Sequence, residues 1–132
     1  MKSLSDCAIL VVDDTEANID ILLEALGDDY DVMVAMDGED ALEMVAEETP
    51  DLVLLDVMMP GMNGFEVCQK LKASPDTTDI AVIFLSGRSE KEDMDRGQEL
   101  GAIDYIIKPF DIQDVRDRVK THLTNILGSS PD

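Results

Sequence analysis

The sequence has few basic residues and no long apolar run. Only ten of its 132 residues are lysine or arginine, thirty are aspartate or glutamate, and the formal net charge is −20. Because phosphate contacts need clustered basic side chains, this balance excludes nucleic-acid binding as the main function. It also disfavours docking on an anionic membrane surface. No run approaches the roughly 20 apolar residues of a transmembrane helix, so we expect no membrane association.

Cysteine and aromatic residues are scarce as well. The chain has two tyrosines, three phenylalanines and no tryptophan. Its two cysteines, Cys7 and Cys68, form neither a CxxC pair nor a disulfide framework, and we interpret both as small core residues. The N-terminal residues lack the long apolar stretch of a secretion signal. We therefore expect a cytoplasmic domain with reduced thiols.

Apolar residues make up 45% of the chain, which is enough for one domain with a buried core. Short apolar runs predict buried strands at 8–12, 32–35, 52–55, 81–85 and 103–107. Segments with apolar residues at every third or fourth position predict helices around 19–26, 41–46, 65–71, 89–100 and 112–126. Asp111 is the expected N-cap of the last helix. The segment 89–100 has few apolar residues, so we expect its helix to pack weakly.

Strands that alternate with helices predict a doubly wound α/β domain. We expect a five-stranded parallel sheet of order 2-1-3-4-5. We assign residues 1–127 to this domain and interpret residues 128–132 as a tail or linker stub. The carboxyl ends of the strands meet at one edge of such a sheet, where these folds place their sites. The polar residues that reach this edge are Asp13, Asp14, Asp56, Ser86 and Lys108.

Three carboxylates in one pocket repel each other unless a cation lies among them. Carboxylate oxygens combined with a backbone carbonyl and waters are the ligands that Mg²⁺ prefers. Lys108 adds a fixed positive charge and Ser86 a hydroxyl donor. A nucleophilic oxygen, a metal and donors for equatorial oxygens are the requirements of phosphoryl transfer.

The same residues form a longer pattern. Its elements, in chain order, are Asp13-Asp14, LLDVMMPGMNG with Asp56, LSG with Ser86, and DYIIKPF with Tyr105 and Lys108. This pattern, over about residues 8–127, resembles the receiver domain of bacterial two-component response regulators. The resemblance implies a flavodoxin-like fold for the domain at 1–127.

The resemblance also implies a role for each acidic residue. Asp56 would be the phosphoacceptor, with a sensor histidine kinase or phosphotransfer protein as the donor. Asp14 would bind Mg²⁺ directly and Asp13 largely through water. Asp56 and the carbonyl of Met58 would complete the protein's share of the metal ligands.

The remaining residues of the pattern would transmit the signal. Lys108 would pair with the phosphate and the Ser86 hydroxyl would bond it, serine standing where the family more often has threonine. Tyr105 would then turn inward behind Ser86 and change the face formed by the fourth helix and fifth strand. Family members also carry a cis bond before the proline, which is implied for Lys108–Pro109.

The function expected from this resemblance is a phosphorylation-dependent signalling switch. Such a domain catalyses only its own phosphorylation and dephosphorylation and is otherwise no enzyme. Its partners would be the phosphodonor and a downstream effector protein or domain. A second copy bound through the fourth helix, fifth strand and fifth helix is a further option.

Two positions bear on how long a phosphate would last. Met58 and Arg88 lie two residues beyond Asp56 and Ser86, at positions that in the family border the route of the attacking water. Met58 cannot orient a water, whereas Arg88 can bond a phosphoryl oxygen from outside. We therefore expect slow self-dephosphorylation.

Two other functions share parts of the pattern. Phosphohydrolases that work through an aspartyl-phosphate usually carry a second aspartate two residues after the nucleophile. This chain has Met58 there, which cannot transfer a proton, and we keep this class as the alternative. A flavin-binding electron carrier needs a hydroxyl-rich loop after the first strand, where the chain has Asp13-Asp14.

Overall fold

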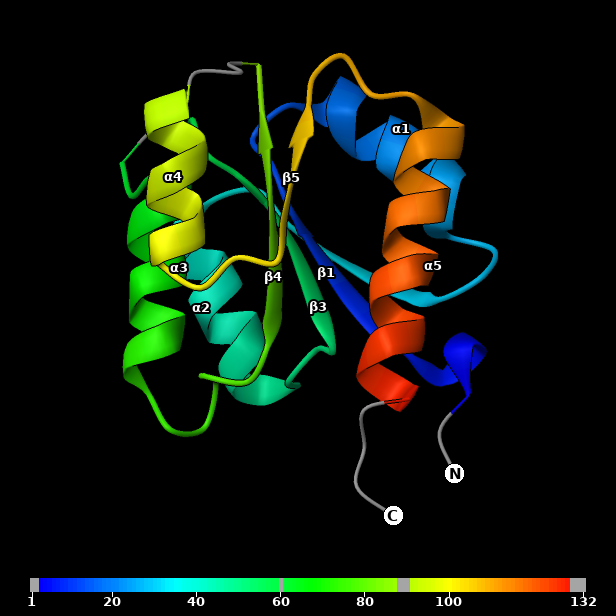
Figure 1. Cartoon of the computed structure of the whole chain (residues 1–132), viewed down its shortest axis with the longest axis horizontal. Coiled ribbons are helices and arrows are strands. Elements are labelled where there is room, and N and C mark those ends of the chain that lie inside the picture. Colours follow the sequence, from blue (N-terminus) through cyan, green and yellow to red (C-terminus); the bar gives the residue numbers. More distant parts are fainter. Residues whose placement is uncertain (1–2, 60, 88–90, 129–132) are drawn as a thin grey trace.

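The computed structural model describes residues 3–59, 61–87 and 91–128. Five parallel strands form one sheet in the order β2-β1-β3-β4-β5 (Figure 1). The strands are β1 (Ala8–Val12), β2 (Asp31–Ala35), β3 (Leu52–Asp56), β4 (Ala81–Ser86) and β5 (Asp104–Ile107). The helices are η1 (Leu4–Asp6), α1 (Glu16–Leu26), α2 (Gly38–Glu47), α3 (Gly64–Ala73), α4 (Lys91–Glu99) and α5 (Ile112–Gly128). The predicted flavodoxin-like α/β fold and strand order are confirmed.

The helices cover both faces of the sheet. Figure 1 shows α1 and α5 on one side and α2, α3 and α4 on the other. Every residue of β3 and β4 is buried, because side chains from each strand point alternately to the two faces. Leu52 and Leu54 lie in the core under α1 and α5, whereas Val53 and Leu55 lie in the core under α2 and α3. The apolar runs of the sequence therefore become strands buried on both faces.

The helix boundaries follow local hydrogen bonds. Asp111 caps α5 as expected, because its Oδ1 accepts from the backbone N–H groups of Gln113 and Asp114. Asn63 and Glu66 cap α3 reciprocally, each side chain accepting from the other's backbone N–H. α5 continues to Gly128, one residue beyond the predicted end of the domain; the rest of the proposed tail, 129–132, lies outside the described residues.

Three further expectations can be compared with the structure. Cys7 and Cys68 are fully buried thiols, as predicted. In the helix predicted around 19–26, Leu23 is 37% exposed, whereas Ile19, Leu22 and Leu26 are buried and form the inner face of α1. Within the described part of α4, Gly97 is the one buried position, in agreement with the predicted weak packing.

No helix in the described ranges is both long and apolar enough to cross a membrane.

Candidate functional site

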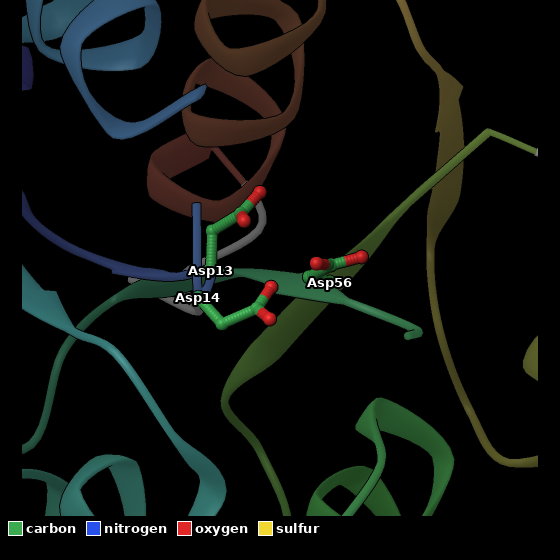
Figure 2. Close-up of side chains that lie close together, drawn as sticks. All are labelled: Asp13, Asp14 and Asp56. Atoms are coloured by element: carbon green, nitrogen blue, oxygen red, sulfur yellow. The ribbon is translucent and has the colours of Figure 1, made fainter. Parts of the chain in front are cut away.

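Three carboxylates meet at the carboxyl edge of the sheet. Asp13 and Asp14 directly follow β1, and Asp56 is the last residue of β3. These strands pair in parallel with Val12 opposite Leu55, so their ends lie side by side. Figure 2 shows the three side chains gathered at this edge, and one oxygen from each lies within 4.8 Å of the others. The prediction that Asp13, Asp14 and Asp56 lie close together is confirmed.

Lys108 is the cation that faces this cluster. Its Nζ lies 3.2 Å from Oδ1 of Asp56 and 3.4 Å from Oδ2 of Asp13. The backbone holds Lys108 next to β4, because its N–H donates to the carbonyl of Ser86 at 2.7 Å. The Lys108–Pro109 bond is cis, as the resemblance implied. Among the residues that the structure describes, one lysine faces three carboxylates, which leaves their summed charge negative.

Burial makes the excess negative charge of the cluster destabilising. Asp13 is 0% exposed and Asp56 is 2% exposed, whereas Asp14 is exposed. Oδ1 of Asp13 accepts from the Thr15 N–H at 2.9 Å, whereas its Oδ2 makes no hydrogen bond among the described residues and faces the ammonium group of Lys108 at 3.4 Å. Because Asp13 shares this lysine with Asp56, its buried charge is incompletely compensated, and a bound cation would supply the missing positive charge. The triad is therefore able to bind a divalent metal, as its hard oxygen ligands also indicate.

The same crowding shifts the titration of Asp56. Burial and the negative charge of Asp13 raise the pKa of Asp56 to about 6, although Lys108 and the Met58 N–H act in the opposite direction. Perturbed carboxylates of this kind are concentrated at functional sites. Oδ1 of Asp56 receives both the Met58 N–H at 3.2 Å and the Lys108 ammonium at 3.2 Å.

The other predicted residues that the structure describes differ in how far their side chains are exposed to solvent. Ser86 is buried at the end of β4, next to β3. Tyr105 is half-buried on β5 and lines a cavity of about 380 Å³ between α4 and β5. The side chain of Met58 is 58% exposed. Arg88 lies outside the described residues.

Sequence reasoning missed the contribution of Thr15. Its backbone N–H donates to Oδ1 of Asp13, and a motif of side chains does not indicate such a backbone donor. Thr15 is the N-cap residue of α1, and threonine before an amphipathic segment is a common N-cap signal. That signal could have placed a free N–H beside the acidic pair.

Comparison with known proteins decides the family. The sequence profile described as "Response regulator receiver domain" matches residues 9–120. The chain belongs to this family. The receiver domain is also 47% identical, over 125 residues, to a "Probable cyclic di-GMP phosphodiesterase" of Vibrio cholerae. That match covers 95% of this chain and 28% of the relative; the chain spans about a quarter of the length of the curated relatives it matches.

Solved receiver structures are similar over almost the whole chain. The "BeF3 Activated DrrB Receiver Domain", whose source is Thermotoga maritima, is 35% identical with a TM-score of 0.82 and covers 90% of this chain and 98% of its own. The Mn²⁺-bound form of response regulator Rcp1 is 25% identical with a TM-score of 0.77, over 95% of this chain and 97% of its own. One relative of this receiver domain thus holds a divalent metal, and another takes beryllofluoride.

Proposed function

We propose that the protein is a phosphorylation-dependent signalling switch whose phosphoacceptor is Asp56. The observation that carries this proposal is the position of Asp56, buried between Asp13 and Lys108 at the carboxyl edge of a receiver fold. A carboxylate oxygen of Asp56 would form a bond to phosphorus while the donor's bond to phosphorus breaks. The donor would be a sensor histidine kinase or phosphotransfer protein, whose nitrogen keeps the electron pair.

Mg²⁺ is the metal we assign to the acidic cluster. Asp14 would bind it directly and Asp13 largely through water, with Asp56 and the carbonyl of Met58 as the other protein ligands. When bound, the ion supplies positive charge that lets phosphoryl oxygens approach three carboxylates. The buried Oδ2 of Asp13 supports this assignment, because it makes no hydrogen bond among the described residues and shares the Lys108 ammonium with Asp56.

The chain's own residues would carry the signal away from Asp56. Phosphorylation adds about −1.5 to −2 charges, which Lys108 and the Ser86 hydroxyl would meet. Ser86 ends β4, whose neighbour β5 carries Tyr105 beside the cavity under α4. The weak seating of α4, where Gly97 is the one buried position among the described side chains, suits an element with two arrangements.

The face formed by α4, β5 and α5 is the surface that we assign to the downstream effector or to a second copy. We place this switch in the cytoplasm and assign residues 1–127 to the receiver domain. Because the match covers only 28% of the phosphodiesterase relative, it carries no phosphodiesterase activity to this chain. The alternative of a phosphohydrolase gains no support, since the exposed side chain of Met58 stands where an acid–base group would be needed.

Acetyl phosphate with Mg²⁺ tests the proposal directly. The wild-type protein should gain the mass of one phosphoryl group, and Asp56→Asn should gain none. Uptake by Asp56→Asn at the wild-type rate would show that the phosphoacceptor is another residue. Release of phosphate from an added phosphomonoester at a steady rate would instead favour the phosphohydrolase.

A further inference from the structure

Gly64 begins α3 directly against the backbone that carries Asp56. Its N–H donates to the carbonyl of Val57 at 3.0 Å, across the turn between β3 and α3. A Cβ at this position would lie 2.9 Å from the carbonyl carbon of Asp56 and 2.9 Å from the Cα of Val57, and closer still to the carbonyl oxygen of Asp56. Real Cβ atoms essentially never approach other atoms this closely. The first turn of α3 therefore packs on this backbone because residue 64 has no side chain.

The kind of atom in contact distinguishes Gly64 from the crowded glycines Gly38 and Gly97. A Cβ at Gly38 would meet side chains of Val67 and Met62, and one at Gly97 would meet the ring of Phe84. Side chains can turn aside, whereas all three atoms nearest to a Cβ at Gly64 belong to the main chain. An added methyl group must therefore displace either α3 or the segment of Asp56 and Val57.

α3 is held firmly against the sheet. Its start is fixed by the reciprocal cap between Asn63 and Glu66. Its inner face is buried in the core, and the ring of Phe65 packs edge-on against Phe84 with centroids 5.1 Å apart. The segment of Asp56 and Val57 is also held, because the Val57 N–H donates to the carbonyl of Leu85 on β4 at 3.0 Å. This segment supplies the Asp56 carboxylate and leads directly to the Met58 carbonyl, so relief of the collision on either side changes how α3 supports these groups.

We propose that Gly64 is a positioning residue of the acidic site. Its missing side chain lets α3 press on the main chain of Asp56 and Val57. This contact sets the direction of the Asp56 carboxylate and of the Met58 carbonyl toward Asp13 and Asp14. A role of Gly64 in supporting phosphoryl transfer rests on the proposed function. An effect of Gly64 on metal affinity does not depend on that function.

Gly64→Ala is the direct test, and Gly27→Ala is its matched control. A Cβ at Gly27 would also strike a main-chain oxygen, that of Leu23 at 2.6 Å, but at the end of α1, away from the carboxylates. Mg²⁺ titrations followed by amide NMR, and beryllofluoride binding, give affinities for folded protein. Gly64→Ala should bind Mg²⁺ at least about tenfold more weakly, since misplaced ligands cost this much or more. Gly27→Ala should stay within about twofold of wild type because its collision is remote.

A purely structural role would lower the urea midpoint of both variants and leave the Mg²⁺ affinity of folded Gly64→Ala at the wild-type value. That result would overturn the proposal. If Gly64→Ala does not fold, Asn63→Ala and Asn63→Ser replace it. Alanine removes the cap of α3 and serine keeps a capping oxygen. A severalfold loss of Mg²⁺ affinity in Asn63→Ala, restored in Asn63→Ser, would support the role of this turn, and equal affinities would contradict it.

The wild-type protein separates this proposal from the proposed function. If wild type binds Mg²⁺ but takes no phosphoryl group from acetyl phosphate, the switch function fails while the metal measurements still decide the role of Gly64. If wild type is phosphorylated and Gly64→Ala binds Mg²⁺ and beryllofluoride equally well, the role of Gly64 alone fails.

Discussion

Two aspartates on different strands of the sheet, separated by β4, lie in opposite electrostatic surroundings. Asp56 ends β3 among Asp13, Asp14 and a single lysine. Asp104 begins β5, where its carboxylate accepts from Arg118 at 2.9 Å and lies 2.9 Å from Nε2 of His122. Burial alone would raise the pKa of Asp104, but His122, the Tyr105 N–H and Arg118 together lower it. Burial and Asp13 instead raise the pKa of Asp56 to about 6.

The difference separates a site that holds a fold together from a site that is built to receive something. At Asp104 the donors match the acceptor, so the ionised carboxylate joins β5 to α5. At Asp56 negative charges exceed the positive one, so the folded protein without metal holds a cluster that favours an added cation or proton. A structural and a functional carboxylate can thus be distinguished by whether the surrounding charges already balance.

Removing one carboxylate from each region should give the largest contrast in metal affinity. We expect Asp14→Asn to weaken Mg²⁺ binding by about a hundredfold, because it removes an exposed anionic ligand from the cluster. Asp104→Asn removes the same charge from the other region and should change Mg²⁺ affinity by less than about twofold. Isothermal titration with MgCl₂ at fixed ionic strength measures both. Equal losses in the two variants would mean that net charge, and not the cluster, attracts the ion.

The two aspartates should also affect stability in opposite directions. The pKa of Asp56 is raised in the folded state, so its favourable contribution exists below its unfolded pKa and is lost as the pH rises through about 6. We therefore expect Asp56→Asn to stabilise the metal-free protein by about 2–3 kcal/mol at pH 8, where each pKa unit corresponds to about 1.4 kcal/mol. The gain should disappear near pH 4 and should shrink in saturating Mg²⁺.

Asp104 is the control for this pH dependence. Its pKa is lowered in the folded state, so its contribution is present above the unfolded value and is lost only as the pH falls through the lower, folded value. Asp104→Asn should destabilise the protein by about 1 kcal/mol at pH 8, since Arg118 is partly exposed and its ion pair is screened. Urea unfolding in EDTA at pH 4, 6 and 8 tests both. A loss of stability at pH 8 in Asp56→Asn would show that its charge is better compensated than the contacts indicate.

The fold and the acidic cluster could be predicted from sequence because both depend on local patterns. Five apolar runs mark the strands, and parallel pairing alone places Asp13 beside Asp56. The exposure of Leu23 could not be predicted, because apolar spacing does not define how wide a face of the helix is buried. The last residue of α5 could not be predicted from apolar spacing either.

Contacts between distant segments are what the sequence could not reveal. Nothing in the sequence around His122 indicates a partner, yet its side chain is half-buried and contacts Asp104, eighteen positions earlier. Gly64 stands in a recognisable loop motif, but nothing in the motif says that α3 would rest on the carbonyl of Asp56. Both depend on how closely two elements approach, which only the assembled structure defines.

A substitution at Lys108 distinguishes metal binding by the acidic cluster from transmission of the signal to α4. Its ammonium group contacts both Asp13 and Asp56, but it is not a metal ligand. We expect Lys108→Ala to keep Mg²⁺ binding and to lose the phosphorylation-dependent amide shifts of α4, because the phosphate then lacks its partner at the end of β5. Lys70→Ala, an exposed lysine on α3, is the control for the lost charge. Wild-type shifts in α4 of the phosphorylated Lys108→Ala protein would exclude this role.

The smallest expected effect concerns the lifetime of the phosphate. Hydrolysis needs a water in line with the phosphorus–oxygen bond, so a side chain over that approach sets the rate. Met58 is apolar and lies on the exposed side of the cluster, and Arg88 can bond a phosphoryl oxygen from outside. Trimming both to alanine should shorten the phosphate half-life severalfold at fixed Mg²⁺, whereas Met58→Leu, which keeps an apolar cover, should leave it nearly unchanged. If the double variant keeps its phosphate as long as wild type, neither side chain shields it, and the metal ligands or a partner phosphatase must set the lifetime.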